Sequence, residues 1–95
     1  MIRRKRRKDG SVQVTFVLPD EGEPASVVAD VNGWDPRSHP LKKRPNGTRS
    51  VSMTLPAGSR IRFRYLDGKG RFFDDPEGDG TEPNGYGGTN TVLQA

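Results

Sequence analysis

The chain has 95 residues, of which 16 are Lys or Arg and 12 are Asp or Glu, giving a formal net charge of +4. A chain of this length can build one hydrophobic core, so a single domain is expected. The sequence has no cysteine, which excludes disulfides, thiolate nucleophiles and cysteine-based zinc sites and suits a reducing cytoplasm.

The positive charge is concentrated at the start of the chain, where residues 3–8 are all Lys or Arg. Removing these six charges from the net +4 leaves −2, so residues 1–10 are predicted to form a basic N-terminal tail. The tail could contact phosphate groups, but nucleic acid is not the expected partner, and a solvated arm is the simpler interpretation. No stretch approaches the roughly 20 apolar residues of a membrane span, so we expect no membrane partner and a cytoplasmic location.

Alternating apolar and polar residues mark a series of short strands. In residues 11–18, Val12, Val14 and Phe16 alternate with polar residues, which is the pattern of a strand with one buried face. Similar runs, separated by residues that favour turns, occupy 25–31, 41–44, 48–55, 60–66, 71–73 and 90–94. About seven short antiparallel strands predict an all-β fold, an immunoglobulin-like β-sandwich formed by residues 11–95.

The strand at 60–66 has two faces of very different chemistry. Ile61, Phe63 and Tyr65 should point into the core, because they alternate along the strand. The arginines between them, including Arg64, then lie on a strongly basic exposed face.

Residues 74–88 contain almost no apolar residue except Tyr86. A loop this long inside a small domain is uncommon unless it has a function, so it is a candidate binding loop. Asp75, Glu77 and Asp79 have the spacing that opens a calcium loop of the EF-hand type, but the position of the closing glutamate is Tyr86. We therefore expect neither a metal nor another cofactor.

No catalytic constellation is evident in the sequence. His39 is the only histidine, and no nucleophile motif accompanies it. Asp74 and Asp75 are adjacent, so on a strand their carboxylates would point to opposite faces and could not act together across a cleft. The chain is therefore not expected to be an enzyme.

Trp34 is the only tryptophan, and it follows the apolar run 27–31 in a turn formed by Asn32-Gly33 and Asp35-Pro36. A tryptophan at the edge of a sheet can cover the core or offer a flat apolar platform to a ligand, and the sequence leaves both open.

Residues 29–36, Ala-Asp-Val-Asn-Gly-Trp-Asp-Pro, resemble the G-x-F-N-G-W-x-P turn of carbohydrate-binding module family 48, the isoamylase N-terminal or glycogen-binding domain. Ala29 and Val31 stand where the family usually has Gly and Phe. The resemblance continues downstream and covers residues 12–93. It implies a β-sandwich that binds α-1,4-linked glucan without hydrolysing it.

The resemblance also implies a role for particular residues. Trp34 would stack on glucose, Arg64 would replace the family's usual lysine as a hydrogen-bond donor, and Asn90 of the segment Gly-Gly-Thr-Asn would bind hydroxyl groups. Phe72 aligns with the second stacking tryptophan of a W-x-x-D-P segment, and Tyr86 lies in the loop that can clasp the chain.

The register of the hairpin leaves open whether Phe72 or Phe73 faces outward, since a shift of one residue exchanges the faces; the W-x-x-D-P spacing favours Phe72. The expected function is the non-catalytic binding of glycogen, starch or maltooligosaccharide. The alternative is an interaction module that docks to a glycogen-metabolising enzyme without binding sugar.

Overall fold

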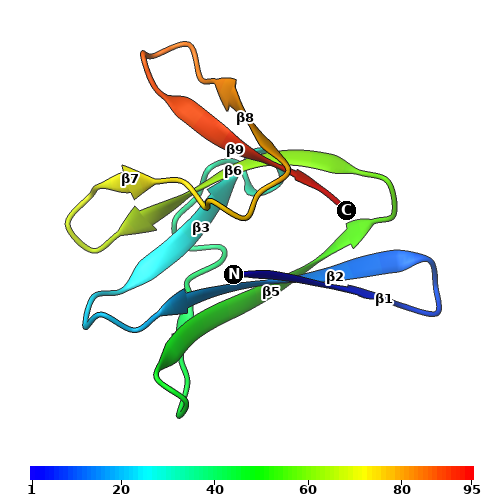
Figure 1. Ribbon diagram of the computed structural model, residues 1–95, viewed down its shortest axis with the longest axis horizontal. Helices are drawn as coiled ribbons and strands as arrows, with labels where there is room; N and C mark the ends of the chain where they lie inside the picture. Colours follow the sequence, from blue (N-terminus) through cyan, green and yellow to red (C-terminus); the bar gives the residue numbers. More distant parts are fainter.

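The computed structural model describes residues 1–95 and shows a β-sandwich made of two antiparallel sheets (Figure 1). The first sheet has the order β1-β2-β5-β4, with bounds Ile2–Arg6, Ser11–Pro19, Thr48–Pro56 and Lys42–Lys43. The second has the order β3-β6-β9-β8, with bounds Ala25–Ala29, Arg60–Asp67, Thr89–Gln94 and Gly80–Pro83. A short strand β7, Phe72–Phe73, also pairs with β6. The predicted β-sandwich is confirmed.

The core lies between the two sheets and consists of the side chains that alternate inward along each strand. Its centre is a group of aromatic rings packed edge to face, with centroid distances of 4.9 Å between Phe16 and Phe63 and 5.6 Å between Phe63 and Tyr65. All three rings are fully buried. The inward positions predicted from the alternation are therefore correct, and the opposite face of each strand is left for solvent or partners.

Residues Ile2–Arg6, which were expected to belong to a solvated tail, form a strand. β1 pairs along its length with β2, from Ile2 opposite Phe16 to Arg6 opposite Val12. The expectation of a solvated arm is wrong for these residues. A run of cations has no apolar alternation to reveal a strand, but at a sheet edge the backbone can pair while the charged side chains remain in water.

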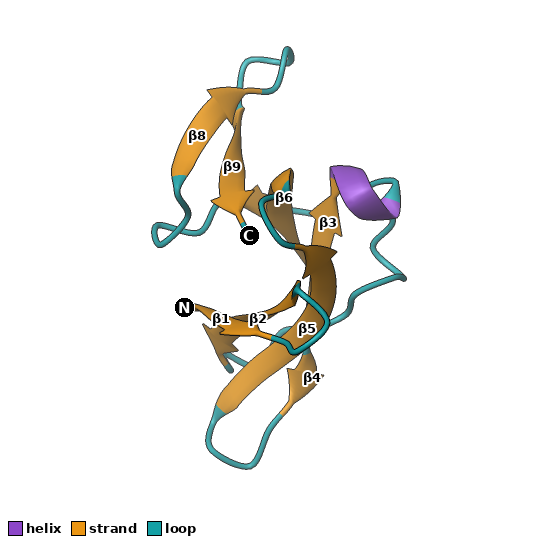
Figure 2. Cartoon of the chain, turned by 90° about the vertical axis from the view of Figure 1, so that its right-hand side faces the viewer, coloured by secondary structure: helices purple, strands orange, loops and turns teal.

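The predicted loop 74–88 also contains a strand, β8, which forms a hairpin with β9. The hairpin projects beyond the body of the sandwich (Figure 2). With β1 and β8 the fold has nine strands where about seven were expected. The only helical element is a single 3-10 turn, η1 (Asp30–Asn32), which ends β3 two residues earlier than predicted. No helix has the length and apolar character needed to cross a membrane.

One hydrogen bond joins the core to the segment that follows β7. The Tyr65 hydroxyl donates to Oδ2 of Asp75 at 2.6 Å, and both residues are buried. Asp75 Oδ1 also accepts a bond from the backbone N–H of Glu77, and its own N–H donates to Thr91 Oγ1. Burial and the neighbouring carboxylate raise the pKa of Tyr65 far above its usual value, so the hydroxyl stays a donor.

We expect Tyr65→Phe to lower the free energy of unfolding by about 1–3 kcal/mol, because it leaves the buried Asp75 carboxylate without its hydroxyl partner. Urea unfolding measures this loss. The matched control is Tyr86→Phe, since Tyr86 is 94% exposed and its hydroxyl makes no internal hydrogen bond. Its effect should stay within about 0.5 kcal/mol. Equal stabilities of the two variants would contradict this role for Asp75.

Candidate glycan-binding site

A hollow of about 770 Å³ opens on the outer side of the second sheet. It brings together all the residues predicted from the sequence to bind sugar, and adds three from the β8–β9 hairpin that were not predicted. The lining residues are Trp34, Arg64, Phe72, Asn84, Tyr86, Gly87, Gly88 and Asn90. The hollow therefore combines three aromatic side chains with a guanidinium and two carboxamides.

The position of Arg64 is set by two strands, β9 and β7, which pair with different parts of the same edge of β6. This edge pairs with β9 up to Phe63, which lies opposite Thr91, and with β7 from Tyr65, which lies opposite Phe73. Arg64 is the residue between the two ladders. Its side chain points outward, as alternation with the buried Phe63 and Tyr65 requires. The notch left between the two partner strands becomes part of the hollow.

Two neighbours hold the Arg64 guanidinium. Its Cζ lies 5.3 Å from the centroid of the Phe72 ring, within the range of a cation–π contact. Its Nε lies 3.4 Å from Oδ1 of Asp74, close enough for charge attraction but without a hydrogen bond, so this buried N–H has no hydrogen-bond partner. Asp74 is itself held by the hydroxyls of Thr89 and Thr91 at 2.8 and 3.1 Å. These two neighbours thus orient the guanidinium, and it still makes no hydrogen bond within the protein.

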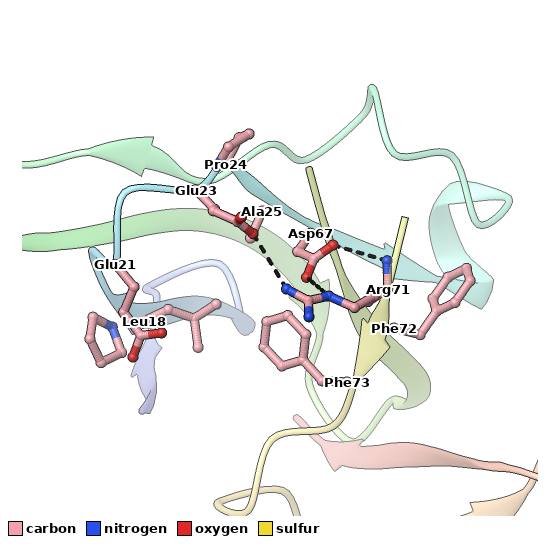
Figure 3. A pocket seen from close by; sticks show the side chains of 10 residues that line it. Leu18, Glu21, Glu23, Pro24, Ala25, Asp67, Arg71, Phe72 and Phe73 are labelled. Carbon is pink, nitrogen blue, oxygen red and sulfur yellow. Dashed lines mark hydrogen bonds and ion pairs between the residues drawn. The ribbon is translucent and has the colours of Figure 1, made fainter. Parts of the chain in front are cut away.

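Phe72 faces the hollow, as the W-x-x-D-P spacing favoured. It pairs with Leu66 on the outer face, whereas Phe73 pairs with Tyr65 and its ring lies 5.1 Å from the Tyr65 ring. Figure 3 shows the two phenyl rings leaving β7 in different directions. Phe73 belongs to a second hollow of about 580 Å³, in which Arg71 is paired with Asp67 at 3.0 Å.

Trp34 is presented by a turn that Asn32 holds together. The Asn32 carboxamide accepts from the N–H of Ala29 and donates to the carbonyl of Val27 and to His39 Nδ1, at 2.9 to 3.1 Å. The backbone of Trp34 has φ +59°, the only positive φ at a residue other than glycine, and its N–H donates to the Ala29 carbonyl. Trp34 is 41% exposed and is not part of the buried core, so the indole lies at the surface and does not seal the core.

The tip of the β8–β9 hairpin is organised by Asn84, a residue that the sequence analysis missed. Its side-chain oxygen accepts the backbone N–H groups of Tyr86 and Gly88, and its own N–H donates to the Gly88 carbonyl. Asparagine followed by glycines, here Asn-Gly-Tyr-Gly-Gly at 84–88, is typical of such a turn, and this pattern could have identified Asn84 from the sequence. The turn leaves the Tyr86 ring almost fully exposed above the hollow.

Several polar groups of the hollow have no hydrogen-bond partner within the protein. No internal hydrogen bond involves the Asn90 carboxamide, the Trp34 indole N–H or the Tyr86 hydroxyl. On the same face of β6, by contrast, Arg60 and Arg62 both bind Glu82, and the hydrogen bond from Arg62 lowers the pKa of that carboxyl. The hollow therefore offers free hydrogen-bonding groups, whereas the neighbouring arginines of β6 are engaged with Glu82.

The acidic residues considered for catalysis or calcium do not converge. Asp74 faces Arg64, while Asp75 is buried against Tyr65. Asp79 accepts hydrogen bonds from Arg4 and from the N–H of Gln94. No three residues of the His, Cys, Asp and Glu types lie in an arrangement that could hold a metal ion.

We expect Asn32→Ala to lower the free energy of unfolding by about 1–3 kcal/mol and to shift the Trp34 emission, because the turn loses all the bonds made by this carboxamide. Chemical unfolding followed by tryptophan fluorescence measures both effects. Asn46→Ala is the matched control: Asn46 bonds only within its own exposed turn, to the N–H and hydroxyl of Thr48. A larger loss of stability in the control would contradict the role given to Asn32.

Comparison with known proteins supports a relation to glucan enzymes over part of the chain. No family model matches the sequence. The 1,4-alpha-glucan branching enzymes GlgB 2 of two strains of Xanthomonas campestris pv. campestris are 34% identical over 47 residues, which is 48% of this chain. The matched stretch spans only 6% of those enzymes. The ferric enterobactin esterase of Salmonella typhimurium has a similar structure, with a TM-score of 0.75 and 15% identity, over 98% of this chain and 33% of the esterase. This second likeness concerns the fold alone.

Proposed function

We propose that this chain is a non-catalytic module that binds α-1,4-linked glucan, such as glycogen, starch or maltooligosaccharide, in the hollow around Arg64. The observation that carries the proposal is the union of exposed aromatic rings with polar groups that have no partner within the protein. Protein groups that bind no other part of the protein remain available for a ligand.

The chemistry of a glucose chain matches these groups. Each glucose unit has an apolar face of C–H groups that can stack on an aromatic ring, and a rim of hydroxyls that both donate and accept hydrogen bonds. Trp34 and Phe72 would supply the stacking surfaces. Arg64 would donate parallel hydrogen bonds to neighbouring hydroxyls, and the Asn90 carboxamide would both donate and accept. Tyr86 would close over the chain from the hairpin tip.

The similarity to the branching enzymes supports a glucan-related role, since their name states that they act on 1,4-alpha-glucan. We assign binding and not catalysis to this chain because the hollow is built from aromatic, amide and guanidinium groups. Its one carboxylate neighbour, Asp74, is engaged with Arg64 and two threonine hydroxyls.

A shallow site of this kind should bind in the micromolar to millimolar range, equivalent to about 4–8 kcal/mol. Titration calorimetry with maltoheptaose should detect this binding, and Trp34 fluorescence should change over the same concentrations. We expect Trp34→Ala to abolish measurable binding. The absence of any response of the unmodified protein at millimolar sugar would contradict the proposed function.

Arg64→Gln should weaken maltoheptaose binding by about 10-fold or more, because hydrogen bonds from a charged group contribute about 1.5–3 kcal/mol. Arg60→Gln is the matched control, since Arg60 lies on the same face of β6 but is paired with Glu82 outside the hollow. Its affinity should stay close to that of the unmodified protein. Equal losses in both variants would show that general charge, and not the site, determines binding.

Phe72→Trp should increase the affinity about 2- to 10-fold, because the larger ring adds stacking area worth about 0.5–1.5 kcal/mol. Phe72→Ala should reduce it. The same calorimetric titration measures both variants, with thermal unfolding as a check that each one folds. If both substitutions leave the affinity unchanged, Phe72 is not a stacking surface.

A further inference from the structure

The two sheets differ sharply in how their cations are neutralised. Every cation on the strands of the second sheet has a carboxylate partner: Arg60 and Arg62 bind Glu82, and Arg64 is paired with Asp74. The four strands of the first sheet contain no Asp or Glu at all, although they contain Lys or Arg on three of the four. The basic face predicted for β6 is therefore largely neutralised. On the first sheet only Arg4, Lys43 and Arg49 have carboxylate partners, Asp79 and Asp20, which lie outside its strands, and the remaining cations are unpaired.

The strand register identifies which of these cations share the outer face of the first sheet. The hydroxyls of Thr15 and Ser52 meet at 2.8 Å on that face, while the residues beside them in each strand point into the core. Arg3 lies directly opposite Thr15. Residues paired directly across a ladder share a face, so Arg3 is on the outer face.

The same reasoning applies to the remaining strands. Lys5 lies opposite Gln13 on β1 and β2, and Lys42 lies opposite Ser50 on β4 and β5. Arg44 follows β4 and its Nε donates to the Ser50 hydroxyl at 2.9 Å, which places its guanidinium on this face too. Two pairs of exposed cations thus flank a strip of hydroxyl and amide groups, and no member of either pair has an ion-pair partner.

The spacing of these cations is set by the geometry of the sheet. Three inter-strand steps of about 4.8 Å separate β1 from β4, so the two cation rows lie about 14 Å apart. Within β1, Arg3 and Lys5 are two positions apart, or about 7 Å. Each strand of a nucleic-acid duplex has one phosphate per about 3.4 Å of helix axis, so the roughly 7 Å between Arg3 and Lys5 spans two such steps and the pair can meet two phosphates of one strand.

We propose that the outer face of the first sheet binds the phosphate backbone of a double-stranded nucleic acid, without reading its sequence. Arg3, Lys5, Lys42 and Arg44 supply the charge. The hydroxyls of Thr15 and Ser52 between them are groups that commonly bind phosphate oxygens. This proposal is independent of the glucan site, which lies on the opposite sheet.

The composition of the face favours this ligand over other anionic partners. The central strands present Gln13, Thr15, Val17, Ser50, Ser52 and Thr54. Without an aromatic ring the face cannot stack the bases of a single strand, and without a cluster of large apolar side chains it lacks both the core of a protein interface and the anchor of a membrane-surface site. Charged side chains on edge strands, lysine especially, also hinder pairing between sheets, and Lys5 and Lys42 can serve both purposes.

The test is fluorescence anisotropy with a labelled DNA duplex of two helical turns, over a series of salt concentrations. With four phosphate contacts, a plot of the logarithm of the association constant against the logarithm of the salt concentration should have a slope of about −3.6. The affinity should then drop roughly 100-fold between about 50 and 200 mM salt. The double variant Arg3→Gln/Lys5→Gln should reduce the magnitude of the slope by about 1.8. Lys42→Gln/Arg44→Gln should do the same from the other edge.

The matched control is Lys69→Gln/Arg71→Gln, which removes the same charge from residues that are paired with Glu23 and Asp67 near the second sheet. Its salt slope should be unchanged, and maltoheptaose should not compete with the duplex. The proposal is overturned if the duplex does not bind at low salt, or if the control loses as much affinity as the two test variants. Tighter binding to a single strand, or to vesicles containing phosphatidylserine, would also overturn it.

Discussion

The division of one edge of β6 between two partner strands is the constraint on which the hollow depends. A single long partner would have covered the whole edge and closed the notch. Because β9 stops pairing at Phe63 and β7 begins at Tyr65, Arg64 lies at a gap in the ladder. The next residues of both partner strands then converge on it, Asp74 from one side and the segment around Asn90 from the other. The backbone topology thus gathers groups from distant parts of the chain.

Pairing of charges determines which polar groups remain available. On β6, Glu82 binds two arginines, while Asp74 holds the third at a distance that orients it without a hydrogen bond. The Arg64 guanidinium therefore makes no hydrogen bond within the protein. On the first sheet the strands themselves contain no carboxylate, and although Asp79 and Asp20 pair with Arg4, Lys43 and Arg49, the cations Arg3, Lys5 and Lys42 face water. Two surfaces of one small domain consequently have different electrostatic characters, although the sequence shows only a modest net charge.

Much of this arrangement follows from the sequence, because alternation fixes which face each residue takes. The buried positions of Phe16, Phe63 and Tyr65 follow directly from it, and so does the outward position of Arg64. The orientation of Phe72 did not follow from alternation, because the register of the hairpin was open, and only the W-x-x-D-P spacing of the family resemblance favoured it. The Asn-Gly and Asp-Pro steps correctly indicated that Trp34 lies in a turn.

Other features depend on contacts that a linear pattern does not contain. β1 forms because a neighbouring strand offers its backbone groups, and a run of cations gives no sign of that. The pairing of Arg62 with Glu82 joins residues 20 positions apart, and the bond from Tyr65 to Asp75 crosses a hairpin. Asn84 acts through backbone groups of its own turn, so only the local spacing of asparagine and glycine could have pointed to it.

The left-handed backbone at Trp34 has a consequence for engineering this domain. Left-handed geometry costs a bulky residue about 1–2 kcal/mol relative to glycine, which adopts it freely. A library selected only for heat resistance would thus be drawn toward glycine at this position, and would discard the indole in the process. Thermal stability and the proposed binding of a ligand make opposite demands on this one residue, so any selection scheme must monitor both.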